Sequence, residues 1–361
     1  MSLPTSVNAI VYTAAGGDEV IKKITIPFPQ QKPDEVVVKI VYGAVNSLDA
    51  YLRYAAKATD VWKVSSVDCR KGLYPVPGYP QVSGVEASGY IVSLPTDQNV
   101  LNDKWYKLRG YKVGGKALIG GFGTFAEYVS LPWKWIFPAP ETLPFDIGAA
   151  ATNHALTAVT FMTEAYNVQK GDIIFIHTVA GSLGLLFTAY AKSRGATVIG
   201  TTSTPEKAEL AKSYGADHVI LYTKENLAER VKEITNGEGV HAVFDGVGKD
   251  TFAADLEILR RKGTLVVSGM ASGAPDPISP LQLGAKNLKL VNPAMAGYIA
   301  TSEEAQRYIQ EVFQCLESGL FKTRIFAVYP FTAEAVRKAQ KEITTPGGKL
   351  AGKLLIKVSS E

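Results

Sequence analysis

Cysteine is scarce in this sequence: Cys69 and Cys315 are its only two, and they lie far apart. Such a pair excludes a disulfide framework and a Cys-rich structural zinc site. No apolar run approaches the roughly 20 residues needed to cross a bilayer. Residues 1–13 also lack the basic and apolar regions of a secretory signal. We therefore expect a cytoplasmic protein with no membrane partner.

Histidine is nearly as scarce, with four residues in the chain: His154, His177, His218 and His241. No two of them share a helix face at the spacing of metal ligands, and no cysteine lies near any of them. A catalytic zinc ion needs three protein ligands. We therefore expect no metal, and we expect core or strand-end roles for His177 and His218.

Charge of either sign is also modest. The 361 residues carry a formal charge of +4, with 46% hydrophobic and 20% charged residues, as in an ordinary soluble protein. This excess does not by itself indicate nucleic-acid binding. Residues 260–262 form a basic block before Gly263, which predicts the C-terminal end of a helix. The length predicts two domains.

The first third of the chain contains short β-type runs separated by Gly, Pro and polar clusters, which predicts a largely antiparallel, barrel-like β domain. From Phe145 the chain becomes helical, and from Gly171 strands and helices alternate. Strands are predicted at 172–178, 196–202, 217–222, 240–248 and 264–270, with helices at 183–195, 205–215, 224–237 and 251–263. These strands are nearly continuous apolar runs, which indicates a doubly wound parallel sheet. Further on, we expect a strand at 288–295, a helix at 302–319 and a strand at 352–358.

The segment VAGSLGL (residues 179–185) connects the first of these strands to its helix. Gly181 and Gly184 match the last two glycines of G-x-G-x-x-G, whereas Val179 stands where the first would be. A glycine lets the backbone approach a pyrophosphate, which the helix N-terminus also attracts. We predict a dinucleotide site formed by Ala180, Gly181, Ser182, Leu183 and Gly184.

The segment GTTSTPEK (residues 200–207) ends the second strand and indicates which dinucleotide binds. NAD sites usually have an acidic residue here to hold the ribose 2′-hydroxyl. This chain has Thr201, Thr202 and Ser203 instead, which leave room for a 2′-phosphate. Lys207 and Tyr214 are predicted to reach that phosphate. NADPH is therefore favoured over NADH.

Residues 46–75, NSLDAYLRYAAKATDVWKVSSVDCRKGLYP, contain Asn46, Tyr51 and Tyr74 around a stretch with no helix or strand period. Two interpretations are open. Either these three residues belong to one active site and a long loop separates them in the sequence, or the segment is an ordinary helix followed by surface residues.

Taken with the motifs above, the chain resembles the medium-chain dehydrogenase/reductase superfamily, and within it the zinc-free quinone oxidoreductases of the zeta-crystallin type. The resemblance is strongest in VNSLDAYLR, KGLYP, VEASGYIV, GTFAEYV, GKDTF and RRKGTLVVSGMASG. Zinc-dependent members carry Cys and His in two regions where this chain has Asn46 and Val85. The resemblance implies a GroES-like catalytic domain, residues 1–144 and 287–361, around a Rossmann domain, residues 145–286.

The resemblance also implies roles for individual residues. In this family an Asn and two Tyr line the nicotinamide cleft, which assigns catalytic roles to Asn46, Tyr51 and Tyr74. Further cofactor contacts are implied for Thr157, Ser268, Gly269 and Lys353. Homodimers through edge strands of the cofactor domains are implied too, with residues 288–295 as the edge.

The chain departs from the family pattern in AGSLG, which replaces A-G-G-V-G, and in an added segment, residues 54–70, that we expect to be a partly ordered lid. The predicted reaction is hydride transfer from NADPH to a quinone, with the Asn46 amide and a tyrosine hydroxyl stabilising the developing oxyanion. One alternative is reduction of an alkenal, enone or enoyl-thioester double bond. Another is an NADPH-binding structural or RNA-binding protein, which no basic stripe favours.

Overall fold

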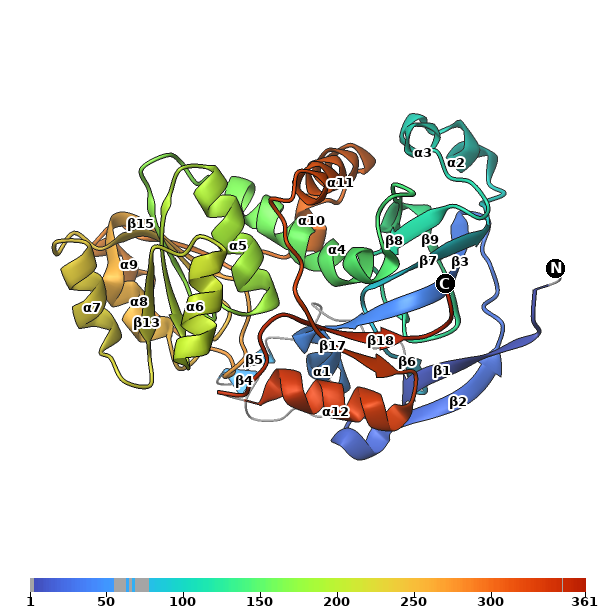
Figure 1. The fold of residues 1–361 in the computed structure, drawn as a ribbon, viewed down its shortest axis with the longest axis horizontal. Coiled ribbons are helices and arrows are strands. Elements are labelled where there is room, and N and C mark those ends of the chain that lie inside the picture. The colour runs from blue at the N-terminus through green and yellow to red at the C-terminus, as the bar shows by residue number, and fades with distance from the viewer. Residues whose placement is uncertain (1–2, 55–62, 65–66, 69–77, 346) are drawn as a thin grey trace.

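The computed structural model describes residues 3–54, 63–64, 67–68, 78–345 and 347–361. The molecule has two halves, one built on a parallel sheet and one mostly antiparallel, joined by the long helix α4 (Phe145–Thr160) (Figure 1). The last strands of the chain lie beside the first ones, far from the parallel sheet that precedes them in sequence.

The parallel sheet has the strand order β13-β12-β11-β14-β15-β16. Its strands are β11 (Ile173–Ile176), β12 (Thr197–Thr202), β13 (His218–Leu221), β14 (Val240–Asp245), β15 (Leu259–Val267) and β16 (Lys289–Val291). The order reverses at β11, so the sheet is doubly wound and the predicted fold class is confirmed for this half.

Helices cover both faces of this sheet because alternate strand side chains point to opposite sides. Ile174 and Ile176 of β11 join a core formed with α4, α5 and α11, while Phe175 joins a second core with α7 and α8. The helices are α5 (Ser182–Ser193), α6 (Pro205–Ser213), α7 (Leu227–Ile234), α8 (Phe252–Ile258) and α11 (Ser302–Glu317). This packing fixes the loops at the carboxyl edge of the sheet.

The predicted helix 251–263 was wrong in its second half. Helix α8 ends at Ile258, and Leu259 pairs with Val240 as part of β15. The basic block therefore begins a strand: Arg260 donates to His241, and Lys262 has a φ of 67°. Pairing with the neighbouring strand outweighs the local helix signal.

The antiparallel half contains a larger sheet of order β10-β8-β7-β3-β18-β17, with β9 also paired to β3. Its strands are β3 (Glu35–Val45), β7 (Ala87–Ser93), β8 (Lys116–Ile119), β9 (Tyr128–Pro132), β10 (Ile136–Pro138), β17 (Ile325–Pro330) and β18 (Lys353–Lys357). Strand β18 is inserted between β3 and β17, antiparallel to the former and parallel to the latter. The C-terminal segment is thus integral to the sheet formed by the N-terminal third.

A smaller sheet, β2-β1-β6, completes this half, and a hairpin pairs β4 with β5. These strands are β1 (Ser6–Tyr12), β2 (Ile21–Pro27), β4 (Lys63–Val64), β5 (Val67–Asp68) and β6 (Gln81–Val82). The remaining helices are α1 (Ser47–Tyr54), α2 (Gln98–Asn102), α3 (Lys104–Arg109), α9 (Leu281–Gly284), α10 (Met295–Tyr298) and α12 (Ala333–Thr344). Short turns of helix lie at η1 (Asp18–Val20), η3 (Trp133–Trp135) and η4 (Phe161–Ala165).

Strand β16 pairs with β15, so the parallel sheet continues beyond residue 286, where we placed the end of the cofactor domain. Helix α11 also packs its Ile309 and Val312 into the core of that sheet. The division into residues 1–144 with 287–361 and residues 145–286 stays a prediction. Most of the predicted lid, residues 54–70, lies outside the described residues.

Candidate active site

The loop between β11 and α5 has the geometry of a dinucleotide loop. Thr178 adopts a left-handed φ of 51°, its carbonyl accepts from the Gly181 N–H at 2.8 Å, and Gly181 is the N-cap of α5. A side chain at Gly184 would place its Cβ 2.4 Å from the Thr178 carbonyl oxygen. Gly184 therefore allows the helix to pack closely on the strand, leaving the first N–H groups of α5 without intrahelical partners.

The ends of the neighbouring strands bring other predicted residues to the same edge. The Val179 N–H donates to the Thr201 carbonyl at 3.0 Å, which places the loop beside the end of β12 with Thr202 and Ser203. Ser268 and Gly269 follow β15, and the Ser268 hydroxyl donates to the Asp245 carbonyl at 2.9 Å. Parallel strands have their carboxyl ends at one edge, where such folds bind ligands.

Lys207 lies beyond the end of β12, near the first turn of α6. Its Nζ contacts Ser203 Oγ at 3.5 Å and donates to the Gly348 carbonyl at 2.5 Å, and burial lowers its pKa. Tyr214 lies at the other end of α6, where burial raises its pKa and the charge of Arg324 opposes that rise. Lys207 thus connects the end of β12 to the C-terminal segment that leads into β18.

Two further polar residues near these segments were not identified from the sequence: Tyr222 after β13 and Arg324 before β17. The Tyr222 N–H donates to the Thr202 carbonyl at 3.2 Å, and its side chain is half exposed. Arg324 is exposed, and its Nε donates to the Ala351 carbonyl at 3.0 Å. No local motif marks either residue, because their positions depend on β13 and on the chain before β17.

A buried polar cluster lies where β18 meets β3. Lys353 Nζ donates to Asn46 Oδ1 at 2.6 Å and lies 2.8 Å from Glu86 Oε2, and the three side chains are at most 6% exposed. The other Glu86 oxygen accepts from the Asn153 N–H at 2.5 Å. A buried carboxylate is tolerated only when it is paired and hydrogen-bonded, and Lys353 supplies that pairing.

The Asn46 amide is fully engaged within this cluster. Its Nδ2 donates to the Ala44 carbonyl at 3.1 Å and to Glu86 Oε2 at 3.0 Å, so both amide hydrogens have acceptors. The Asn46 N–H donates to Asp49 Oδ2 at 2.8 Å. Burial raises the pKa of Asp49 to about 7, against the effect of its hydrogen bond from Asn46 and the charge of Lys353.

His154 on α4 connects this cluster to the cofactor loop. Its Nδ1 lies 2.9 Å from Ser182 Oγ, and its Nε2 lies 3.4 Å from Lys353 Nζ. Burial and the charge of Lys353 hold the pKa of His154 well below its ordinary value, so the ring is neutral. The sequence marked Ser182 as a departure from the family pattern, but nothing in it marked His154 as its partner.

The remaining predicted residues are placed differently. The Thr157 hydroxyl donates to the Asn153 carbonyl at 2.7 Å, within α4 itself. Tyr51 lies half-buried on α1, one turn after Ser47. Tyr74 lies outside the described residues. The roles assigned to these side chains stay predictions.

One group of metal-type side chains occurs among the described residues: His177, Asp245 and Asp255, all buried. His177 Nε2 lies 2.8 Å from Asp255 Oδ1, and His177 Nδ1 lies 3.0 Å from Thr201 Oγ1. Burial would lower the pKa of His177, but the hydrogen bond and the charge of Asp255 raise it. The group lies under the cofactor loop, with His177 directly before Thr178.

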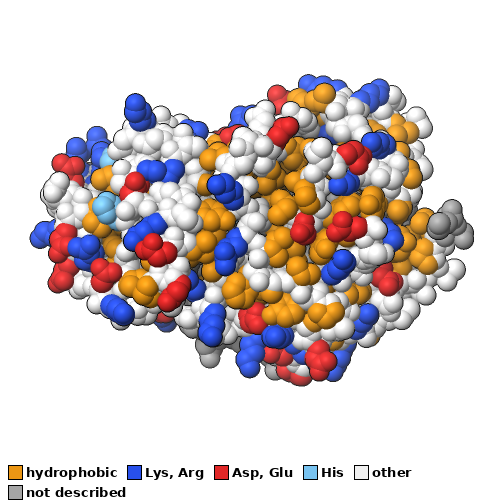
Figure 2. Space-filling model, viewed as in Figure 1, with side chains coloured by type: hydrophobic (Ala, Val, Ile, Leu, Met, Phe, Trp, Pro, Cys, Tyr) orange, Lys and Arg blue, Asp and Glu red, His pale blue; other side chains and the backbone are white. Residues whose placement is uncertain are grey.

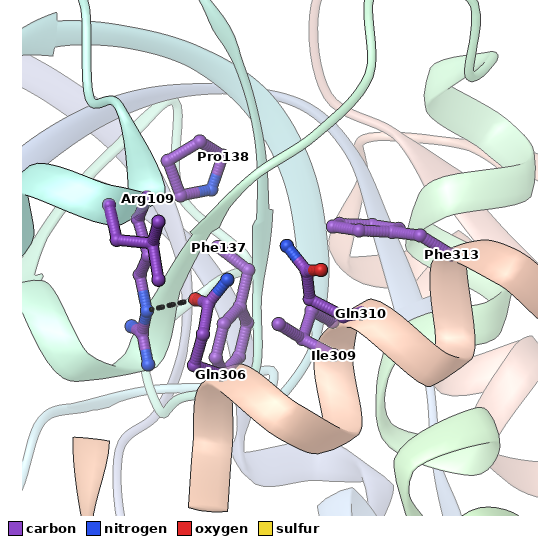
Figure 3. A pocket seen from close by; sticks show the side chains of 8 residues that line it. Arg109, Phe137, Pro138, Gln306, Ile309, Gln310 and Phe313 are labelled. Carbon is purple, nitrogen blue, oxygen red and sulfur yellow. Dashed lines mark hydrogen bonds between the residues drawn. The ribbon is translucent and has the colours of Figure 1, made fainter. Parts of the chain in front are cut away.

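Two hollows lie elsewhere, and no predicted site residue within the described ranges lines either. One, of about 60 Å³, lies between Arg109, Phe137 and α11, where Arg109 donates to Gln306 (Figure 3). It is too small for a dinucleotide. The other, of about 560 Å³, is lined by residues 78–82, Phe122 and Gly123. Among the described helices, none combines the length and apolar character of a membrane span.

Comparison with known proteins agrees with this architecture. Residues 32–141 match the alcohol dehydrogenase GroES-like domain, and residues 182–314 match a family described as zinc-binding dehydrogenase. A probable quinone oxidoreductase of Schizosaccharomyces pombe is 34% identical over 300 residues, which cover 83% of this chain and 82% of the relative. The Escherichia coli quinone oxidoreductase complexed with NADPH superposes with a TM-score of 0.84 at 28% identity, covering 97% of this chain and 99% of that one. A 2-haloacrylate reductase of Burkholderia sp. is 33% identical over 217 residues, 59% of this chain and 65% of the relative.

The fold and these relatives define an oxidoreductase with a GroES-like domain and a Rossmann-like domain. Within that class, the chain belongs to the quinone oxidoreductase family of the medium-chain dehydrogenase/reductase superfamily. The predicted family and the predicted fold class are confirmed.

The family description mentions zinc binding, but the residues around Asn46, Glu86 and Lys353 are not suited to a zinc ion. Asn46 and Val85 occupy the two positions that carry Cys and His in zinc-dependent members, and Val85 has no ligand atom in its side chain. The Lys353 ammonium already neutralises Glu86 and contacts Asn46 Oδ1. A second cation in this space would be repelled by Lys353.

Proposed function

We propose that this protein transfers a hydride from NADPH to a quinone without a metal ion. One observation carries the proposal. His154 contacts Ser182, the first residue after the loop between β11 and α5, and it also contacts Lys353, in the buried polar cluster of Asn46, Glu86 and Lys353. It places a dinucleotide loop beside a buried polar cluster contributed by the other half of the molecule. NADPH supplies the hydride, and the protein orients the nicotinamide and excludes water.

NADPH rather than NADH is favoured by the residues after β12. Thr202 and Ser203 stand where an NAD site has an acid, and Lys207 in the first turn of α6 contacts Ser203 and Gly348. The NADPH complex of the Escherichia coli relative supports the same choice. We propose that Lys207, with Thr202 and Ser203, binds the adenosine 2′-phosphate; Tyr214, for which the sequence predicted the same role, lies at the other end of α6.

For the chemistry, we propose that Asn46 acts by holding Lys353, because both of its amide hydrogens already have acceptors. Stabilisation of the quinone oxyanion is then assigned to the hydroxyl groups of Tyr51 and Tyr74. Thr157, Ser268, Gly269 and Lys353 are proposed to line the cofactor site. In this assignment a single hydroxyl donor at the oxyanion is worth about 10²-fold in kcat.

The test is a panel of quinones and enals assayed with NADPH and with NADH. We expect quinone-dependent oxidation of NADPH, and we expect Lys207→Ala to raise the KM for NADPH about tenfold or more while leaving that for NADH unchanged. Lys212→Ala, on the exposed side of the same helix, is the matched control. A wild-type preference for NADH would contradict the cofactor assignment.

A second candidate activity is reduction of a conjugated carbon–carbon double bond. The 2-haloacrylate reductase among the relatives supports it. The same cofactor geometry serves both reactions, since each adds hydride to an electron-poor carbon. Turnover of 2-haloacrylates or enals faster than of any quinone in the panel would favour it. Acidic and basic side chains are interspersed on the face in Figure 2, which gives no support to an RNA-binding role.

We further propose a homodimer formed through β16. This strand is an edge of the parallel sheet, and Leu290 on it and Leu281 before it are 38% and 86% exposed. An edge with exposed apolar residues is suited to pairing with a second copy. Leu290→Lys should reduce the mass measured by sedimentation to that of one chain. We also propose the domain division given above and a cytoplasmic location, which cell fractionation tests.

A further inference from the structure

His154 and Ser182, on neighbouring helices, connect the buried cluster of Asn46, Glu86 and Lys353 to the N-terminus of α5. His154 comes from α4, and Ser182 is the first residue of α5, after the N-cap Gly181. Small residues of α4, among them Ala151, Ala155 and Ala158, bring the helix close to Leu186 and Tyr190 of α5 in one core. The 2.9 Å contact of His154 Nδ1 with Ser182 Oγ is therefore made by rigid elements.

The direction of this hydrogen bond follows from Lys353. An ammonium group has no acceptor, so the imidazole nitrogen that bonds to it must accept. Lys353 Nζ lies about equally far from the two ring nitrogens, 3.4 Å from Nε2 and 3.5 Å from Nδ1, but Nδ1 has a shorter contact of 2.9 Å with Ser182 Oγ, which leaves Nε2 to face Lys353. The neutral tautomer with its proton on Nδ1 satisfies both contacts, because Nε2 then accepts from Lys353 and Nδ1 donates to Ser182 Oγ.

The hydroxyl hydrogen of Ser182 is left to point elsewhere. The Gly181 N-cap makes no side-chain hydrogen bond to the helix, and the first N–H groups of α5 face the same region. An anion at a helix N-terminus accepts from such donors. A hydroxyl held there in a fixed direction adds one more donor.

We propose that His154 is a positioning residue that directs the Ser182 hydroxyl toward the pyrophosphate of NADPH. Lys353 sets the tautomer of His154, and Lys353 is itself held by Asn46 and Glu86. The affinity for NADPH thereby depends on the cluster of Asn46, Glu86 and Lys353 in the antiparallel half of the molecule. The inference rests on the proposed binding of NADPH at this loop.

The test measures NADPH dissociation constants from the fluorescence of the bound cofactor, for wild type, His154→Phe, Ser182→Gly and the double variant. Each single change should weaken binding about ten- to a hundredfold, the range expected for one hydrogen bond to a charged acceptor. The double variant should be no weaker than Ser182→Gly alone, because His154 acts only through Ser182. His154→Asn, whose amide can donate to Ser182, should restore part of the affinity.

Controls separate this inference from its alternatives. Ser193→Gly, at the far end of α5, should leave NADPH affinity unchanged. Affinity for 2′-AMP, which has no pyrophosphate, should be the same in all variants. Additive effects in the double variant, unchanged NADPH affinity in His154→Phe, or equal loss of 2′-AMP affinity would overturn the proposal. Failure of the wild type to bind NADPH would instead refute the cofactor assignment.

Discussion

The two halves of the molecule each bury a pair of carboxylates, and they neutralise them differently. In the antiparallel half, Glu86 and Asp49 lie near Lys353, whose ammonium is 1% exposed. Under the cofactor loop, Asp245 and Asp255 lie near His177. Lysine provides a charge that persists throughout the neutral range, whereas histidine provides one that titrates.

The difference between a lysine and a histidine partner predicts how the stability of each cluster should respond to mutation and to pH. Removal of Lys353 leaves the buried Glu86 carboxylate without its counter-charge, so its effect on stability should be large. Removal of Asp255, the partner of His177, should lower the stability most at the pH values at which His177 is charged. The three predictions below separate these behaviours.

The largest effect is expected from Lys353→Met. It removes the ammonium and leaves the buried Glu86 carboxylate uncompensated, which typically costs about 3–5 kcal/mol of folding free energy. Chemical denaturation measures the loss, and quinone-dependent oxidation of NADPH should fall with it. Lys357→Met, an exposed position on the same strand, should cost less than about 1 kcal/mol. Equal losses in both variants would show that the strand, not the ion pair, determines the effect.

A smaller, pH-dependent effect is expected from Asp255→Asn. Asp255 raises the pKa of His177, so this pair stabilises the fold fully below about pH 6.5 and less as the pH rises through the raised pKa. The variant should therefore lose about 2 kcal/mol at pH 6 and clearly less at pH 9. Asp250→Asn, which is exposed, should show neither loss. A deficit that is the same at both pH values would mean that the charge of His177 is irrelevant.

An effect of the opposite sign, a relative gain of stability as the pH rises, is expected from Asp49→Asn. Because burial raises the pKa of Asp49 from 3.8 to about 7, the native state binds more protons than the unfolded state between these values. Wild-type stability should therefore decrease as the pH rises from about 4 to about 7. The variant should lack this contribution, so its stability relative to wild type should rise by about 1 kcal/mol per pH unit between pH 5 and pH 7. Asp276→Asn, at an exposed position, should follow the wild-type curve.

Most of the parallel half could be predicted from the sequence, because its signals are local. Apolar runs such as 173–176 are long enough to identify a buried strand, and Gly181 and Gly184 identify the loop that follows it. The prediction failed at Leu259, where a strand begins inside an apparent helix. Only its pairing with Val240 explains that residue, and pairing is not a local property.

The polar cluster could be predicted only in part. Family resemblance indicated Asn46 and Lys353, but not that the two contact each other across 307 positions. Nor did it indicate that Asn46 donates one amide hydrogen to Glu86 and the other to the Ala44 carbonyl. These contacts follow from the insertion of β18 beside β3 and from the packing of α4. They therefore could not be predicted from the spacing of residues along the chain.

The insertion of β18 between β3 and β17 has a consequence for the order in which the protein is made. On a ribosome, the first 144 residues emerge with Glu86 already present, but its partner Lys353 is synthesised more than 250 residues later. Until then, the edge of β3 that pairs with β18 is open and Glu86 lacks its lysine partner. A nascent chain halted before β18 therefore exposes a sheet edge to its neighbours. The pairing of β3 with β18 and of Glu86 with Lys353 has to wait until β18 has been synthesised.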